Sequence, residues 1–183
     1  MAAPLTVTFA AGVGAWRVER IEPVIGDSLP VAKRLAMIEG ATSPTPSASS
    51  WSLRGVTSNT RYATRGEVNE LVARQHGLGR AEATRAALIP IRKTEAWWAL
   101  AQDERRAIFE ERSRHTAIGL DYLPAVARRL HHSRELGEPF DFLTWFEYAP
   151  EHSEAFEEMV RRLRATEEWQ FIDREVDIRL ARD

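Results

Sequence analysis

The chain has 183 residues, of which 44% are hydrophobic and 28% charged, an ordinary balance for a water-soluble globular protein with one substantial core or two small, closely packed subdomains. The formal net charge of -2 provides no basic field for nucleic acid, whose binding depends on neutralising phosphates. Because there is no cysteine, the composition excludes disulfides, thiolate zinc sites, iron-sulfur clusters and thiolate-ligated haem.

The first fifty residues predict two strands followed by a loop. Residues 5–10 alternate between apolar and polar side chains, and residues 16–24 suit a second strand after a glycine-rich turn at 12–14. The Pro/Ser/Thr/Ala run at 41–50 cannot bury enough apolar area to order itself, so it predicts a surface loop. No basic segment precedes the apolar start, so we expect a mature cytoplasmic protein that does not insert into a membrane.

Strands and helices alternate in the middle of the chain. In chain order we predict a strand at residues 51–63, a helix from Thr64 to about Gly77, a strand at 86–93, a helix opening at Thr94-Glu95, and a helix at 103–123. The pair Thr64 and Glu67 has the spacing of a capping box, and Pro124 cannot continue the last of these helices.

The C-terminal third predicts a hairpin, a helix and a final strand. Residues 129–136 and 139–149 flank a Gly-Glu-Pro turn, as the two arms of a hairpin do. The helix at 150–165 has one apolar face, and the strand at 168–180 has alternating apolar residues. Strands that return between helices indicate an α+β fold of ferredoxin-like units, an antiparallel sheet with helices packed on one face.

His115 is the first candidate functional residue. It shares an apolar helical stripe with Ile108, Ile118 and Tyr122, so its imidazole is expected to point inward. On this pattern alone a buried structural histidine is the commoner explanation. The remaining histidines have no metal-ligand spacing with one another, and a zinc site of the His-x-x-x-His kind is unsupported.

Arg128 follows four small or apolar residues at 124–127. Burying a guanidinium costs several kcal/mol by order of magnitude unless it is paired, so Arg128 faces either a carboxylate or a bound anion. The neighbouring tryptophans Trp97 and Trp98 point about 100 degrees apart on a helix, so that one can enter a core while the other meets a cofactor or partner. Lys93 is one of two lysines in the chain and is suited to an acidic group at the same edge.

Four segments taken together resemble the chlorite dismutase family, specifically its short, N-terminally truncated lineage. They are ALIPIRKTEAWWAL at 87–100, DERRAIFEERSRHTAIGLDYLPAVAR at 103–128, GEPFDFLTWFEYAPEH at 137–152, and RATEEWQFIDREVDIRL at 164–180. The similarity extends over nearly all of residues 51–182, and the agreement of separated segments in order and spacing makes it specific. The fragments GAW and EPVIGDSL among the first fifty residues also resemble this lineage.

The resemblance implies a haem b enzyme that converts chlorite to chloride and dioxygen. It implies a dimeric α/β-barrel type of fold, a homodimer, and a single haem domain in which residues 1–50 form a truncated N-terminal ferredoxin-like part and 51–183 the haem-binding part. It also implies that one oxygen atom passes to ferric haem while the hypochlorite that remains is retained for O–O bond formation.

The resemblance assigns roles to the candidate residues. His115 matches the proximal iron ligand, and Glu168 matches the carboxylate that hydrogen-bonds it. On the distal side, Arg128 matches an arginine that would retain hypochlorite, and Gln75 falls where the short lineage has a glutamine. Four further residues match positions at the haem edge or the proximal pocket: Lys93, Trp97, Trp98 and, with a looser alignment, Tyr62. Of these, Lys93 and Trp98 are suited to a haem propionate, and Tyr62 is a third candidate for it.

Three other functions are compatible with the same kind of pocket. Coproheme decarboxylase belongs to the same structural family, but as a rule lacks the distal arginine, so that Arg128 argues against it. A peroxidase-like haem enzyme is the second alternative, although a peroxidase needs a distal acid-base residue to cleave peroxide. A non-enzymatic haem-binding or sensing module is the third.

Overall fold

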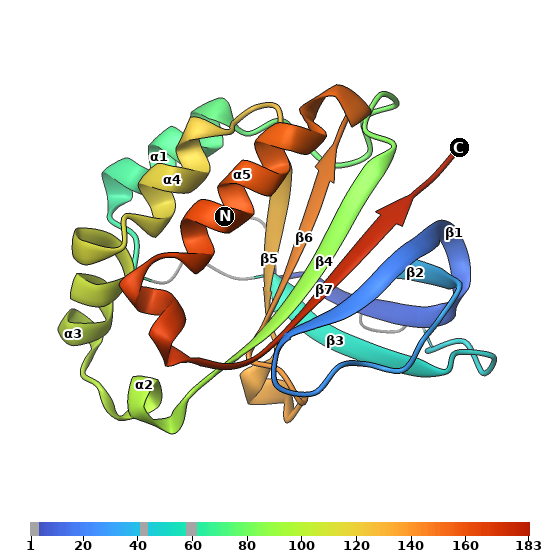
Figure 1. Cartoon of the computed structure of the whole chain (residues 1–183), viewed down its shortest axis with the longest axis horizontal. Coiled ribbons are helices and arrows are strands. Elements are labelled where there is room, and N and C mark those ends of the chain that lie inside the picture. Colours follow the sequence, from blue (N-terminus) through green and yellow to red (C-terminus); the bar gives the residue numbers. More distant parts are fainter. Residues whose placement is uncertain (1–3, 41–43, 58–61) are drawn as a thin grey trace.

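A computed structural model describes residues 4–40, 44–57 and 62–183, and its centre is an antiparallel sheet with helices on one side (Figure 1). The strands are β1 (Thr6–Ile25), β2 (Arg34–Glu39), β3 (Trp51–Thr57), β4 (Arg85–Lys93), β5 (Ala127–His132), β6 (Phe142–Tyr148) and β7 (Ile172–Ala181). The helices are α1 (Arg65–Arg74), α2 (Glu95–Ala99), α3 (Gln102–Arg106), α4 (His115–Asp121) and α5 (Ser153–Arg164).

The strands close on themselves. Their order is β2-β1-β3-β5-β6-β4-β7, and β1 pairs in addition with β7, so that six strands form a ring to which β2 is added. Neighbouring strands are antiparallel, as between β5 and β6, where Arg128 lies opposite Phe146. The predicted α+β class, with an antiparallel sheet and helices on one face, is confirmed.

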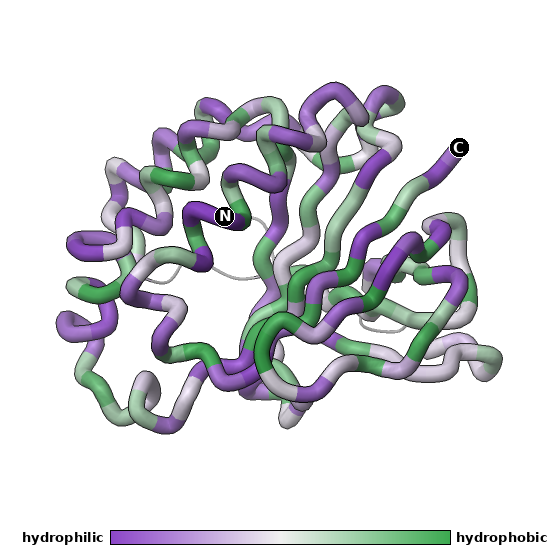
Figure 2. The backbone as a smooth tube through the Cα atoms, in the orientation of Figure 1, coloured by the Kyte–Doolittle hydropathy of each residue, from purple (hydrophilic) through white to green (hydrophobic). Residues whose placement is uncertain are grey.

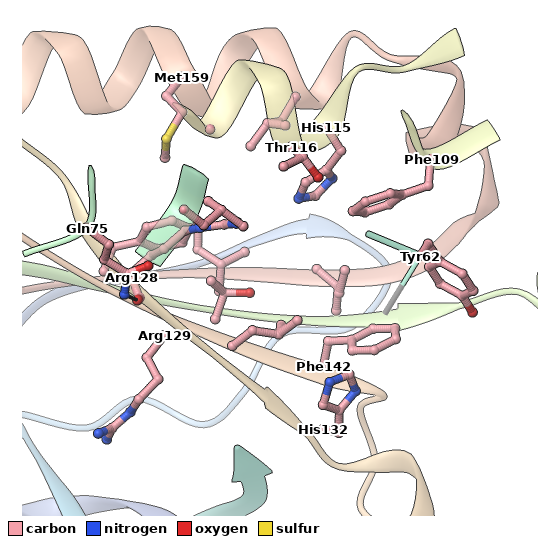
Figure 3. A pocket seen from close by; sticks show the side chains of 18 of the residues that line it. Tyr62, Gln75, Phe109, His115, Thr116, Arg128, Arg129, His132, Phe142 and Met159 are labelled. Atoms are coloured by element: carbon pink, nitrogen blue, oxygen red, sulfur yellow. Dashed lines mark hydrogen bonds between the residues drawn. The ribbon is translucent and has the colours of Figure 1, made fainter. Parts of the chain in front are cut away.

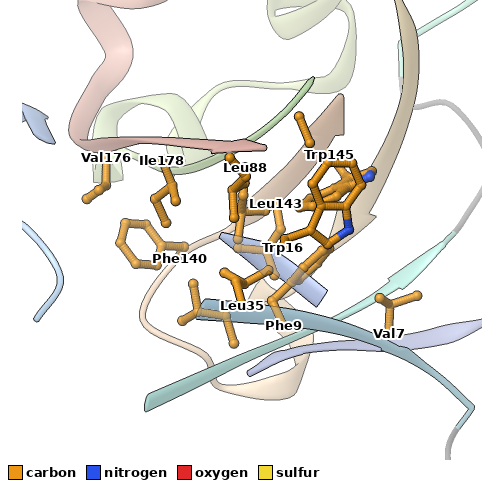
Figure 4. Packing of buried hydrophobic residues seen from close by; sticks show 13 residues of the cluster. Val7, Phe9, Trp16, Leu35, Leu88, Phe140, Leu143, Trp145, Val176 and Ile178 are labelled. Atoms are coloured by element: carbon orange, nitrogen blue, oxygen red, sulfur yellow. The ribbon is translucent and has the colours of Figure 1, made fainter. Parts of the chain in front are cut away.

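Alternation along the strands produces two cores. The first is enclosed by the strands and includes Phe9, Leu88 and Trp145 (Figure 4). The second lies between the outer face of the sheet and the helices, and includes Ile89 from β4 and Phe156 from α5. Figure 2 shows hydrophobic residues along the central strands, and helices in which hydrophilic and hydrophobic residues alternate. Neighbouring residues on β4, such as Leu88 and Ile89, therefore pack into different cores.

The N-terminal prediction needs two corrections. The predicted strands at 5–10 and 16–24 belong, from Thr6 onward, to one long strand, β1, and the glycines between them form an irregularity where the register with β2 shifts. A side chain at Gly14 would come within 2.5 Å of the β2 backbone at Ala36, so that the strand can pass β2 only with a glycine there. β2 itself was not predicted. The division of the domain at residue 50 remains a prediction, and β1 pairs with β7 across it.

The predicted helix at 103–123 is wrong as a single helix. α3 runs into a π-helical turn, Ala107–Arg112, and α4 then begins at His115 after Arg114 adopts a left-handed conformation with φ of 53°. His115 is therefore the first residue of a helix and does not lie in the middle of one. The C-terminal strand also starts later than predicted, at Ile172, because Glu167–Phe171 forms a 3-10 turn.

Other predicted boundaries are closer. Thr64 and Glu67 form both hydrogen bonds of the capping box, and α1 ends at Arg74, three residues before the predicted Gly77. The hairpin of β5 and β6 is confirmed. The predicted strand at 51–63 ends at Thr57, and its residues 58–61 lie outside the described residues, as do 41–43 of the predicted loop. Across the described ranges, every helix falls short of the length and apolar character that crossing a lipid bilayer requires.

Candidate functional site

A cavity of about 800 Å³ separates the helices from the outer face of the sheet (Figure 3). Much of its wall is apolar, with contributions from Ile89 on β4, Phe142 on β6 and Met159 on α5. Its volume is in the range of about 300 to 1,000 Å³ that is typical of sites for drug-sized ligands and cofactors. The cavity replaces close packing in part of the second core, where α1, α4 and α5 cover the sheet.

His115 enters this cavity from the first turn of α4 (Figure 3). Its Nδ1 lies 2.6 Å from Oε2 of Glu168. Because an ionised carboxylate only accepts hydrogen bonds, Nδ1 carries a proton, and when the imidazole is neutral its lone pair is on Nε2. The imidazole also stacks on Phe109, with ring centroids 4.4 Å apart and planes 22° apart. Orientation and tautomer of His115 are therefore both fixed.

Glu168 is buried, with 2% of its surface exposed, and both of its carboxylate oxygens are engaged. Nζ of Lys93 donates to Oε1 at 2.6 Å, and the Glu168 N–H donates to Oγ of Ser113 at 2.9 Å. Burial by itself raises the pKa of Glu168, but the charges and hydrogen bonds of His115 and Lys93 outweigh it and hold that pKa at about 2. Glu168 is thus an ionised acceptor held between two donors.

Arg128 reaches the same cavity from β5. Alternation along the strand puts it on the cavity side together with Leu130 and His132. Its guanidinium lies over Gly119 of α4, because a Cβ added at Gly119 would be 3.8 Å from Cζ of Arg128. Arg128 and Gly119 therefore line the same part of the cavity. Burial lowers the pKa of Arg128, and the negative charge of Glu110 opposes that change.

Gln75 is the C-cap residue of α1, and its side chain contacts the strand that carries Arg128. Nε2 of Gln75 donates to the backbone oxygen of Arg128 at 2.6 Å, so that the amide binds the backbone and leaves the guanidinium to other partners. Both residues line the cavity (Figure 3). The predicted distal pair is therefore brought together, by a contact that the sequence did not indicate.

The predicted haem-edge residues lie close to one another but have different environments. The ammonium of Lys93 lies 4.2 Å from the centre of the Trp97 ring, and Tyr62 packs edge-on against the same indole at 5.9 Å. All three line the cavity. Trp98 lies outside it, and its Nε1 donates to Asp141 at 3.2 Å.

The polar groups of the predicted propionate contacts already have protein partners. The Lys93 ammonium is bound to Glu168, the Trp98 indole to Asp141, and the Tyr62 hydroxyl accepts a hydrogen bond from Arg105 at 3.3 Å. A propionate would therefore compete with these contacts, and the roles that the resemblance implies for these residues remain predictions.

Sequence reasoning missed several residues that shape the site. Phe109 and Glu110 stand in the π-helical turn before His115, where α-helical spacing does not predict their positions. Trp169 follows Glu168, stacks toward His115 at 6.4 Å, and donates from Nε1 to the buried Glu175 at 2.7 Å. Of these residues, only Trp169 could have been expected from the sequence, because it directly follows the predicted site residue Glu168.

The residues present fit a haem group. The cavity has apolar walls and admits one imidazole that, in its neutral form, has the lone pair on Nε2, while Glu168 and Lys93 supply the partners that a ligating histidine requires. The indole N–H of Trp97, on the wall of this cavity, is buried without a hydrogen-bond acceptor among the described residues. An acidic guest group would supply such an acceptor.

Comparisons with known proteins indicate one family. A sequence model of the chlorite dismutase family matches residues 35–183. The chain is 59% identical to the dimeric chlorite dismutase of Nitrobacter winogradskyi, whose crystal structure it matches with a TM-score of 0.88 over 97% of this chain and 99% of that chain.

Two more distant similarities were found. A variant chlorite dismutase from Candidatus Nitrospira defluvii has the same fold, with 22% identity and a TM-score of 0.71 over 98% of this chain and 91% of that chain. A segment of 62 residues, 34% of this chain, is 39% identical to the chlorite dismutase of Ideonella dechloratans and spans 20% of that protein. Since the family match extends over most of the sequence, this chain belongs to the chlorite dismutase family.

Proposed function

We propose that this protein is a haem b-dependent chlorite dismutase, which converts chlorite to chloride and dioxygen. The observation that carries the proposal is a single cavity lined by both His115, whose Nδ1 is held by Glu168 at 2.6 Å, and Arg128. The 59% identity to a dimeric chlorite dismutase, over 97% of this chain and 99% of that chain, supports it.

In this proposal His115 holds the iron through Nε2. Glu168 accepts a hydrogen bond from the Nδ1–H group, which fixes the neutral tautomer and makes the imidazole a stronger donor. Lys93 keeps Glu168 ionised through a buried hydrogen bond of 2.6 Å. When bound, haem b would supply an iron that can accept an oxygen atom from chlorite.

Arg128 acts on the anions of the reaction. Chlorite carries a negative charge, and a guanidinium on the cavity wall attracts it and orients it by a charge-assisted hydrogen bond. When chlorite gives up one oxygen atom it leaves hypochlorite, also an anion. Arg128 retains the hypochlorite within the apolar walls, so that both oxygen atoms leave as dioxygen and chlorine leaves as chloride. Gln75 holds the strand at the backbone of Arg128.

The decisive experiment is chlorite turnover followed with an oxygen electrode. A charge-assisted hydrogen bond contributes about 1.5–3 kcal/mol, so Arg128→Ala is expected to lower kcat/KM by about 10- to 100-fold and to release hypochlorite that a scavenger traps. Arg74→Ala is the control, because Arg74 is exposed at the end of α1 and pairs with Glu70 outside the cavity. Absence of oxygen evolution from the haem-loaded protein contradicts the proposal.

Further assays on the same samples distinguish the alternative functions. Oxidative loss of two carboxyl groups from coproheme in the presence of peroxide would favour the biosynthetic enzyme. Turnover of peroxide without oxygen from chlorite would favour a peroxidase, and haem binding with neither activity would favour a sensing module. Retention of haem by His115→Ala would contradict the ligand assignment in every case.

We also propose that the protein forms a homodimer. The support is its similarity to a Nitrobacter winogradskyi protein that is described as dimeric and that it matches over 97% of its length. Light scattering of the purified protein would measure the mass directly, and a value near 20.8 kDa, the mass of one chain, would contradict this proposal.

A further inference from the structure

The helix that carries His115 begins in an unusual way. α4 starts at His115 itself, and its N-cap residue is Arg114, which has a left-handed backbone with φ of 53°. The first N–H groups of any helix have no partner within the helix and need an acceptor from elsewhere. A serine, threonine or aspartate at the N-cap normally provides one, but an arginine side chain has no acceptor atom.

Glu110 provides the missing acceptors. Its Oε2 accepts the N–H of Thr116 at 2.7 Å, and its Oε1 accepts the N–H of Ala117 at 3.2 Å. Thr116 is 1% exposed, so water does not offer its N–H an alternative partner. A carboxylate at this end of a helix also interacts favourably with the helix dipole. Glu110 therefore replaces the N-cap side chain for the two residues that follow His115.

The π-helical turn explains why Glu110 can reach this place. In the turn Ala107–Arg112 the chain takes more residues per turn than an α-helix, and the N–H of Ser113 donates to the oxygen of Ile108, five residues earlier. The same turn places Phe109 against the face of the His115 ring. One short segment therefore makes two kinds of contact: Phe109 stacks on the imidazole of His115, and Glu110 binds the backbone of the next two residues.

Glu110 also interacts with Arg128 through its charge. Its negative charge opposes the lowering of the pKa of Arg128 by burial. The guanidinium of Arg128 lies over Gly119 of α4, the helix that begins with His115. A change at Glu110 therefore acts on the backbone of Thr116 and Ala117 through two hydrogen bonds, and on Arg128 through charge.

We infer that Glu110 is a positioning residue for His115: its carboxylate fixes the first turn of α4 and so sets the direction of the imidazole toward the iron. The inference rests on the proposed function, in which His115 is the haem ligand. Partners that orient a metal ligand typically change metal affinity by about 10- to 100-fold when removed. Glu110 acts through the backbone, so we expect the lower end of that range.

The test uses the haem-loaded protein and three variants. Glu110→Ala removes both acceptors, Glu110→Gln retains one oxygen, and Glu111→Ala is the matched control, because Glu111 is exposed in the same turn. Haem transfer to apomyoglobin gives the release rate, and resonance Raman spectroscopy of the ferrous protein gives the iron–histidine stretching frequency.

We expect Glu110→Ala to release haem about 10-fold faster and to shift the iron–histidine band, with Glu110→Gln intermediate and Glu111→Ala unchanged. A purely structural role would weaken folding without moving that band in the protein that stays folded. If Glu110→Ala does not fold, the band and release rate of Glu110→Gln decide the inference. An unchanged band and release rate in the folded variants overturn it.

His115→Ala distinguishes this failure from failure of the proposed function. Haem loss in His115→Ala together with unchanged Glu110 variants refutes only the positioning role. Haem retention in His115→Ala with an unchanged iron–ligand spectrum refutes the ligand assignment, and the inference with it.

Discussion

His131 makes this fold sensitive to acid. Its side chain is fully buried, in contact with Phe9 inside the strand barrel. Nδ1 lies 2.9 Å from the backbone oxygen of Leu143, to which it must donate, and Nε2 accepts from Nε of Arg129 at 3.0 Å. Both contacts can form only when the imidazole is neutral, because a protonated Nε2 would put two donors face to face.

The size of the effect follows from the pKa of His131. Burial lowers it from 6.5 to about 4, assisted by the charge of Arg129, while the carbonyl of Leu143 opposes the change. Because the unfolded chain takes up this proton first, the stability contribution is complete above pH 6.5 and is lost as pH falls toward 4. At 1.36 kcal/mol per pH unit, the free energy of unfolding decreases by about 3 kcal/mol over this interval.

Urea unfolding at pH 7.5 and pH 4.5, with the haem content kept the same in all samples, measures this loss. His131→Leu removes the titrating group, so we expect it to be less stable than the wild type at pH 7.5 but to lose about 2–3 kcal/mol less on acidification. Carboxylates that titrate in this range contribute equally to both proteins and cancel in the comparison. His76→Leu, at an exposed position, should lose as much as the wild type. An identical loss in wild type and His131→Leu would refute the reasoning.

Two further predictions concern packing and capping. Gly55→Ala would put a methyl group 2.6 Å from Cβ of His131, so thermal unfolding should show a loss of stability of about 1–3 kcal/mol. Gly77→Ala should cause no such loss, because the space around the added methyl group is open. Equal melting temperatures of the two variants would contradict the packing argument. Glu67→Gln removes the charge and one of the two oxygens that Arg106 contacts at 2.8 Å; the hydrogen bond from Arg106 holds the pKa of Glu67 at about 2. We expect about 1 kcal/mol of destabilisation at pH 7, since the pair is partly exposed, and a double-mutant cycle with Arg106→Ala that gives no coupling would exclude the ion pair as its cause.

The sequence by itself determined the features that depend on near neighbours in the chain. The capping box of Thr64 and Glu67, the hairpin of β5 and β6, and the strand β4 need only local spacing, and the structure has them. The family resemblance further indicated His115 and Arg128, and these do line one cavity.

Only the tertiary structure decided the features that depend on distant segments. β1 is continuous because β2 and β3 pair with its first half and β7 with its second. The burial of Lys93 beside Glu168 joins residues 75 positions apart, which no local pattern encodes. The break before His115 occurs because α4 must pack against α5 while the π-helical turn aims Glu110 at its first N–H groups. Short-range propensity favours one uninterrupted helix there, and long-range packing and hydrogen bonding override it.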